Sequence, residues 1–251
     1  MEWSFPADPH LRAPLCTQSL LDPSGVTPPP ATFESGQAAV EYAVAVPSGY
    51  TPRYAYPLIV WFHDDGGDER DVLDWLPQLS PQNYLGLGLR GPLPVGDGLP
   101  GQRRWSLGRQ HLEWLEDQLG LALMETARQY SFHAERIVAA GIGGGATLAL
   151  QMLLRRPELF AAAACLNAQF PPQQCLAGWG RYSGRNLWLG HSRLLHCGPS
   201  RPAIASARLL HTTGFNVCPQ YYDDDAWPLE TFGRDVDRWL MPVLCGERAV
   251  A

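Results

Sequence analysis

Two hydrophobic patterns alternate along this chain: short runs that are apolar throughout, and longer segments in which apolar residues recur every three or four positions. The run 58–62 contains no polar residue, as is typical of a strand buried on both faces of a parallel sheet. The segment 108–130 carries leucines at helical spacing along one stripe, which predicts an amphipathic helix. Alternating strands and helices predict an α/β fold, a three-layer α/β/α sandwich around a mainly parallel sheet.

These patterns extend over most of the chain. The expected strands are 38–46, 58–62, 84–89, 136–140, 160–166, 186–189 and 216–222. The expected helices are 108–130, 146–155, 203–212 and 229–240. Residues 1–36 are rich in proline and lack a sustained period, so we interpret them as an N-terminal extension to one domain at 37–251. Parallel sheets hold ligands beyond the carboxyl ends of their strands, so the loops there are the expected site.

Composition narrows the class of protein. Of 251 residues, 45% are hydrophobic and 18% charged, which is typical of a globular protein. The formal charge of −6 argues against nucleic-acid binding, which draws on clustered Lys and Arg. No run approaches the roughly 18–20 apolar residues of a membrane span, and the N-terminus lacks the pattern of a secretory signal, so a cytoplasmic location is expected. The six cysteines form no Cys-x-x-Cys pair, and we expect buried, reduced thiols.

Three segments carry a resemblance to a known family. Residues 46–50 and 56–67, the latter ending in His63-Asp-Asp-Gly-Gly67, resemble the first strands of phospholipase/carboxylesterase-type α/β-hydrolases. In that family a His-Gly-x-Gly-Gly loop lends a backbone N–H to the oxyanion hole. Residues 133–146 are similar to its strand–Gly-x-Ser-x-Gly–helix unit, and 186–240 to its closing segment. The resemblance covers about 38–240 and implies a sandwich of the α/β-hydrolase type.

The catalytic side chains that the resemblance implies are absent from their positions. The nucleophilic serine falls on Gly143, the acid on Leu195 and the imidazole on Asp225. A hydrogen atom, a hydrocarbon and a carboxylate cannot replace the hydroxyl, acid and imidazole of a catalytic triad. Moving the last assignment by one position supplies no base, because no histidine follows His211. No catalytic residue of the family's kind is therefore expected.

A vestigial oxyanion hole is still expected. Its donors would be the backbone N–H of Gly144 and one N–H from Asp64 or Asp65, beside the positive end of the following helix. The two carboxylates and the acidic run 223–225 would crowd the same mouth with negative charge. A small neutral ligand fits there better than an anion. The candidate lining residues are His63, His191 and Trp227.

Parts of the sequence are also compatible with two other kinds of site. The imidazoles and carboxylates at this edge of the sheet suit a divalent metal, but nothing in their spacing requires one. Gly141-x-Gly143-x-x-Ala146 also fits a dinucleotide-binding fingerprint, yet no acidic residue closes the next strand. We therefore expect no metal and no cofactor.

The functional hypothesis follows from the missing side chains. We expect a catalytically inactive carboxylesterase homologue that acts as a binding or assembly protein, with a protein partner or a second copy of the chain. Residues 1–36 are the candidate docking element. The alternative is an active hydrolase on ester-type substrates that uses a non-standard Asp/His or metal-assisted site.

Overall fold

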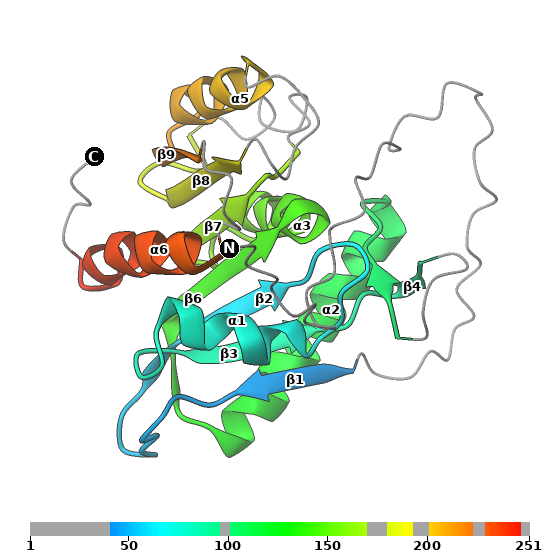
Figure 1. The fold of residues 1–251 in the computed structure, drawn as a ribbon, viewed down its shortest axis with the longest axis vertical. Helices are drawn as coiled ribbons and strands as arrows, with labels where there is room; N and C mark the ends of the chain where they lie inside the picture. Colours follow the sequence, from blue (N-terminus) through cyan, green and yellow to red (C-terminus); the bar gives the residue numbers. More distant parts are fainter. Residues whose placement is uncertain (1–40, 96–100, 170–179, 193–200, 223–228, 247–251) are drawn as a thin grey trace, which may run out of the picture.

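A computed structural model describes residues 41–95, 101–169, 180–192, 201–222 and 229–246. One seven-stranded sheet has the order β1-β3-β2-β6-β7-β8-β9, and only β1 runs antiparallel to its neighbour (Figure 1). Its strands are β1 (Tyr42–Ala45), β2 (Tyr56–Phe62), β3 (Leu85–Leu89), β6 (Phe132–Ile142), β7 (Ala162–Leu166), β8 (Asn186–Ser192) and β9 (Asn216–Tyr222). A separate small ribbon pairs β4 (Leu93–Pro94) with β5 (Arg103–Arg104).

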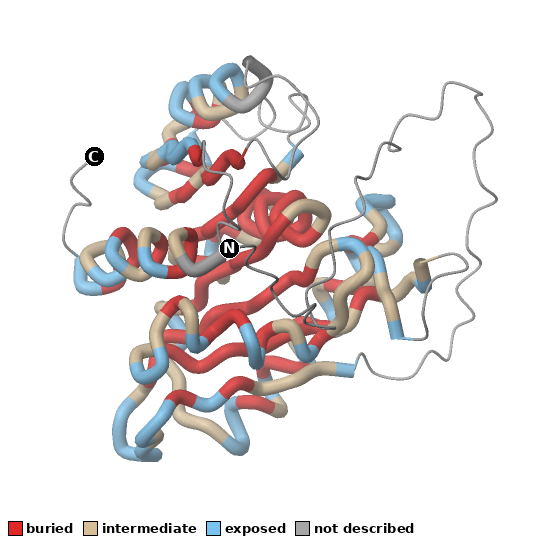
Figure 2. The backbone as a smooth tube through the Cα atoms, in the orientation of Figure 1, coloured by how far each residue is buried: buried red, intermediate tan, exposed pale blue. Residues whose placement is uncertain are grey.

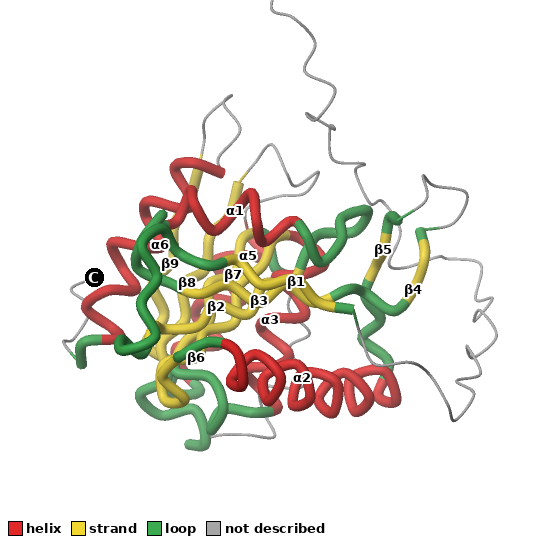
Figure 3. The backbone as a smooth tube through the Cα atoms, turned by 90° about the horizontal axis from the view of Figure 1, so that it is seen from below, coloured by secondary structure: helices red, strands yellow, loops and turns green. Residues whose placement is uncertain are grey.

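Helices cover the sheet on both sides. They are α1 (Asp71–Leu79), α2 (Arg109–Gln129), α3 (Gly143–Arg155), α5 (Arg201–Thr212) and α6 (Leu229–Leu244). One core packs α2, α3 and α5 against the sheet, and a second core packs α1 and α6 against the opposite face. Figure 3 shows α1 and α2 on opposite sides of the strands. The predicted three-layer α/β sandwich with a mainly parallel sheet is therefore confirmed.

The position of β2 inside the sheet, with a core on each face, explains why its sequence is apolar without a break. Its side chains alternate between the two cores: Val60 and Phe62 face α2 and α3, whereas Trp61 faces α1 and α6. Every residue of β2 is buried, as is every residue of β3 and the part of β6 from Ile137 to Ile142 (Figure 2). Burial of each large apolar side chain stabilises the fold by roughly 1.5–3 kcal/mol, so both faces of this strand contribute.

The predicted elements match the structure closely from residue 108 onward, in the described part of the chain. The strand expected at 216–222 is β9, and the helix expected at 108–130 is α2 at Arg109–Gln129. The first strand is shorter than expected, at Tyr42–Ala45, and residues 38–40 lie outside the described part. The N-terminal extension expected at 1–36 also lies outside it. None of the described helices is both long and apolar enough to cross a membrane.

Helix α1 was missed in the sequence because it is short and contains Pro77. Proline lacks an N–H and disfavours a helix interior, so the sequence around Pro77 predicts a loop. Packing holds the helix nevertheless. Trp75 stacks on Trp61 of β2 with ring centroids 4.0 Å apart, and its ring also lies against Phe232 of α6 with centroids 5.8 Å apart.

Candidate functional site

The turn between β6 and α3 has the geometry of a strand-to-helix elbow. Strand β6 ends at Ile142 and α3 begins at Gly143, whose φ of +54° lies in the left-handed region. A residue with a β-carbon pays a strain energy of about 1–3 kcal/mol there, and glycine does not. A β-carbon on Gly141 would lie 2.6 Å from the Phe62 carbonyl oxygen, and one on Gly145 would lie 2.5 Å from the Phe62 carbonyl carbon. Glycine is thus required on both sides of the elbow as well.

The loop that follows β2 faces this elbow with a carboxylate. Oδ1 of Asp64 accepts the backbone N–H of Gly144 at 2.9 Å and that of Asp65 at 2.8 Å. Gly144 belongs to the first turn of α3, where backbone N–H groups have no partner within the helix and the helix dipole favours negative charge. The carboxylate therefore caps α3 from a loop that lies 80 residues away in the sequence.

The same carboxylate fills the space above the elbow. A β-carbon on Gly143 would lie 2.6 Å from Cγ of Asp64, much closer than van der Waals contact. One on Gly144 would lie 2.9 Å from Oδ1 of Asp65. Two carboxylates therefore lie over the first turn of α3, and the one on Asp64 occupies the place of a side chain at position 143.

The electrostatics of this arrangement disfavour a second anion. Partial burial raises the pKa of the Asp64 carboxyl, and the N–H bonds from Gly144 and Asp65 act in the opposite direction. The negative charge of Asp65 raises the same pKa further. An anionic ligand would add a third negative charge and would have to displace Asp64 from both donors.

His63 was expected as a pocket residue, and the structure places it inside the loop. Its side chain is fully buried, and burial lowers its pKa to about 4, so the imidazole is neutral at pH 7. Nε2 accepts the N–H of Gly91 at 3.0 Å, so Nδ1 carries the hydrogen and donates it to the Asp64 carbonyl at 2.7 Å. The indole N–H of Trp105 donates to the His63 carbonyl at 2.8 Å. His63 therefore fixes the backbone that presents Asp64.

A further acidic residue, Asp71 at the start of α1, lies against the loop at Gly67. Burial raises the pKa of Asp71 to about 7, and the charges of Asp68, Asp74 and Asp64 add to the effect. Its carboxylate also accepts a hydrogen bond from the N–H of Asp68, which acts the other way. Part of the negative charge around this loop is thus carried by a group that titrates near neutral pH.

A second fixed loop follows β7 and was missed in the sequence. Asn167 is buried, has a φ of +59° and accepts the N–H of Ser192 at 2.8 Å. Thr147 of α3 accepts the N–H of Gln169 at 2.9 Å and donates to the Gly143 carbonyl at 3.0 Å. The available signal was the polar pair Asn167 and Gln169 directly after a buried strand, since asparagine tolerates left-handed backbone better than most residues.

The remaining candidates are placed as follows. His191 lies near the end of β8 and lines a pocket between β8, β9, α3 and α5, away from His63. Leu195, Asp225 and Trp227 lie outside the described residues, so the acid and imidazole assignments stay predictions. In the described part of the chain, no three His, Cys, Asp or Glu side chains gather closely enough to hold a metal ion. Cys165 is fully buried, and burial raises its pKa, so it is not a reactive thiol.

Known structures identify the architecture. No protein-family model and no curated protein matches the sequence. A carboxylesterase of Bacillus cereus is 18% identical, with a TM-score of 0.59 over 82% of this chain and 95% of that chain. The fold is that of the α/β-hydrolases. Esterase PE8 matches this fold with a TM-score of 0.62 at 17% identity, over 82% of this chain and all of that chain (100%). SOBER1 of Arabidopsis thaliana matches at 0.58 and 15% identity, over 76% of this chain and all of that chain (100%).

Within the α/β-hydrolase fold, the elbow at Gly143 is where a nucleophile would stand, at the carboxyl end of a central strand. In the family that the sequence resembles, the loop at the position of 63–67 carries a second oxyanion donor, and that role stays a prediction for this chain. The His-Gly-x-Gly-Gly pattern of the resembling family has glycine at the position of Asp64, and this departure was the signal for the carboxylate above the elbow.

Proposed function

We propose that this chain is a catalytically inactive, carboxylesterase-like α/β-hydrolase that acts as a binding or assembly protein. The observation that carries the proposal is the bond pattern of Asp64. An esterase accelerates acyl transfer by aiming two N–H donors at the oxygen that becomes negative in the transition state. Here the donors expected for that role, on Gly144 and Asp65, both bond to the Asp64 carboxylate.

The elbow supports the same proposal from the nucleophile's side. Gly143 has no side chain, and its left-handed φ of +54° suits glycine. The space that a serine hydroxyl would occupy holds the Asp64 carboxylate. One side chain, Asp64, thus takes up both the space of the nucleophile at 143 and the N–H donors of the oxyanion hole. The sequence assigns no acid at 195 and no imidazole at 225. Members of a triad act together, so the loss of one removes most of the catalysis that all three provide.

An assay with activated esters tests the proposal. Purified protein is incubated with p-nitrophenyl acetate and butyrate and, separately, with a fluorophosphonate probe, beside an active carboxylesterase. We expect no saturable turnover and no covalent label. Either saturable hydrolysis or labelling at any residue would overturn the proposal.

Two variants assign any activity that appears. Asp64→Asn keeps the shape of the side chain but removes its charge, and Asp74→Asn is the matched control because Asp74 is exposed on α1. Turnover lost in Asp64→Asn but kept in Asp74→Asn would establish the alternative, an active hydrolase that uses the Asp64 carboxylate. Turnover that both variants keep would place the activity elsewhere in the chain.

A further inference from the structure

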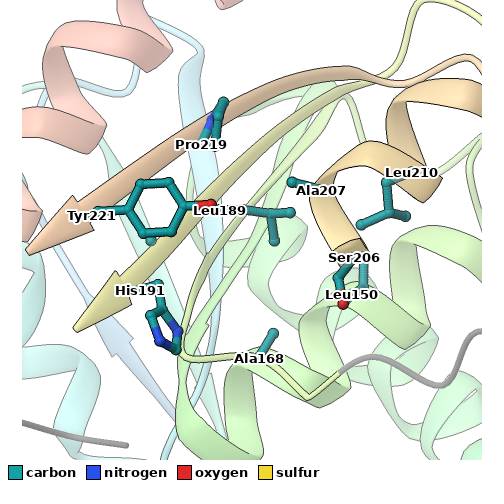
Figure 4. A pocket seen from close by; sticks show the side chains of 10 residues that line it. Leu150, Ala168, Leu189, His191, Ser206, Ala207, Leu210, Pro219 and Tyr221 are labelled. Carbon is teal, nitrogen blue, oxygen red and sulfur yellow. The ribbon is translucent and has the colours of Figure 1, made fainter. Parts of the chain in front are cut away.

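The pocket between α3, α5 and the carboxyl ends of β8 and β9 is too small to hold a ligand (Figure 4). Its cavity volume is about 30 Å³, which is room for a water molecule or two. The rings of His191 and Tyr221 line one side of it, with centroids 6.2 Å apart. A partner of this chain is therefore better sought on its surface, where α2 has the features of a contact face.

The outer face of α2 presents two large apolar side chains to solvent. Leu121 is 48% exposed and Met124 57%, whereas the opposite side of the helix is buried in the core. Met124 is the most exposed large hydrophobic side chain in the described part of the chain. Figure 3 shows α2 on the outside of the strands. Single exposed apolar residues are common, but neighbouring ones on one face indicate a contact surface.

These two residues belong to a stripe with the spacing of a coiled-coil seam, which we call the α2 stripe. Its members are exposed residues separated by four, three and four positions: Asp117, Leu121, Met124 and Arg128. With 3.6 residues in each helical turn, they lie within about 60° of one another around the helix axis. The stripe is thus apolar in its middle and carries opposite charges at its two ends.

The α2 stripe is complementary to itself when two copies of the helix run antiparallel. A two-fold axis midway between Leu121 and Met124 places each Leu121 against Met124 of the other copy. The same axis places Asp117 of each copy opposite Arg128 of the other. Parallel helices in register would instead set like charges against each other, which is unfavourable. The charges therefore select the antiparallel pairing.

Both charged residues can take part in such a contact. The Arg128 side chain is 74% exposed and bonds to Glu125, one turn earlier in the same helix, at 2.7 Å. A guanidinium has five N–H donors, so Arg128 can also bond to a carboxylate of a second chain. Asp117 forms no ion pair with another described residue. Its carboxylate is therefore free to meet an arginine from outside.

Gly120 lies beside the α2 stripe and is unexplained by the fold of one chain. Glycine is less favourable than alanine in the middle of a helix. A β-carbon on Gly120 would meet nothing within 4 Å outside its own turn of helix, so no other described element requires glycine there. A second helix on the stripe would require it, because the absence of a side chain lets two backbones approach closely.

We propose that two copies of this chain associate through α2, antiparallel across a two-fold axis between Leu121 and Met124. Each copy contributes one helix, so the contact is smaller than that of a permanent dimer and the association is reversible. The proposal gives the assembly role a partner and a surface. It goes beyond the proposed function, because neither Asp64 nor Gly143 takes part in it.

Sedimentation equilibrium of the full-length protein, between about 1 and 200 µM, tests the proposal. We expect a monomer–dimer equilibrium whose dissociation constant rises at least about tenfold in Leu121→Ser. Leu73→Ser is the matched control, because Leu73 is 44% exposed on α1 at the other face of the sheet, and it should change the constant less than about twofold. Gly120→Ala should raise the melting temperature, since alanine favours a helix, and still weaken the dimer.

Charge reversal tests the antiparallel pairing itself. Asp117→Arg and Arg128→Asp should each weaken the dimer at least about threefold, because each sets like charges opposite one another. The double variant restores opposite charges and should return to within about twofold of the unaltered protein. Three results would overturn the proposal: a protein that stays monomeric, a dimer that Leu121→Ser leaves intact, or a double variant as weak as the single ones. Ester turnover in the earlier assay would leave these results unchanged, so the two proposals fail separately.

Discussion

The contact between Asp64 and Gly143 can be tested by a double-mutant cycle. The first change is Gly143→Ala, which introduces a β-carbon 2.6 Å from Cγ of Asp64. The carboxylate must then leave, and it gives up the N–H bonds from Gly144 and Asp65. Hydrogen bonds to charged groups contribute about 1.5–3 kcal/mol each, and partial exposure of Asp64 puts these two near or below the lower bound. The displaced contact is therefore worth about 2 kcal/mol.

The cycle separates this loss from backbone strain. Alanine at a φ of +54° costs about 1–3 kcal/mol whatever its neighbours are. We therefore expect Gly143→Ala to destabilise the protein by about 3–5 kcal/mol, but only by the strain energy in the Asp64→Gly background. Gly49→Ala is the strain control, because Gly49 has a φ of +73° and nothing within 4 Å of the added β-carbon.

Urea unfolding at pH 7 of the four proteins in the cycle gives the coupling energy. We expect about 2 kcal/mol, with the sign that makes the double variant more stable than the sum of the two single changes predicts. Changes at non-interacting positions add within about 0.5 kcal/mol. A coupling energy below that value would mean that Asp64 does not occupy the space above Gly143, and the reasoning on the closed oxyanion hole would fail with it.

Three further predictions concern the surroundings of the site and the contact between β3 and α6. Folding raises the pKa of Asp71 to about 7, so its contribution to stability is present at low pH and is lost as the pH rises through 7. Urea unfolding should therefore show the protein gaining about 1.4 kcal/mol between pH 8 and pH 6 from this group, and Asp71→Asn should abolish that gain. Asn167→Ala should cost about 2–4 kcal/mol in unfolding free energy, and Asn167→Gly less, because glycine restores the backbone but not the bond to Ser192. Equal costs would show that the φ of Asn167 carries no strain. Tyr84→Phe should lower the melting temperature, by about 1.5–3 kcal/mol of stability, because the buried hydroxyl donates to Asp237 of α6 at 2.7 Å; an unchanged melting temperature would exclude that bond as a contribution.

The sequence was a good guide where burial on both faces decides the structure. A wholly apolar run such as 58–62 has no stable place except a covered parallel strand, and β2 lies there. The pattern was a poor guide to α1, because Pro77 argues against a helix and tertiary packing, including the stack of Trp75 on Trp61, stabilises it. That contact joins residues 14 positions apart through the fold, and no local pattern encodes it.

The site was predictable in its backbone and not in its side chains. Residues 133–146 were expected to form a strand, a sharp turn and a helix, and Gly143 lies in that turn with a φ of +54°, which glycine adopts without strain. Asp64 and Asp65 were expected to add charge at the mouth of the pocket. The direction in which the Asp64 carboxylate points depends on the rotamer and on the N–H groups that α3 presents, and both arise only when the loop and the helix meet.

The chain lacks both an open elbow with free N–H donors and a base that could activate a serine. A variant that restores the hydroxyl and the donors, but not the base, shows whether the missing base is enough to prevent catalysis. The double variant Asp64→Gly with Gly143→Ser supplies a hydroxyl at the elbow and frees the N–H groups of Gly144 and Asp65. A serine hydroxyl is a weak nucleophile unless a neighbouring base takes its proton. The sequence places a carboxylate at position 225 and a hydrocarbon at 195, so we expect no labelling by fluorophosphonate and no saturable hydrolysis of p-nitrophenyl butyrate. Labelling of the double variant would mean that a working base lies within reach of the elbow, and that the Asp64 carboxylate and the missing hydroxyl at position 143 together keep the chain inactive.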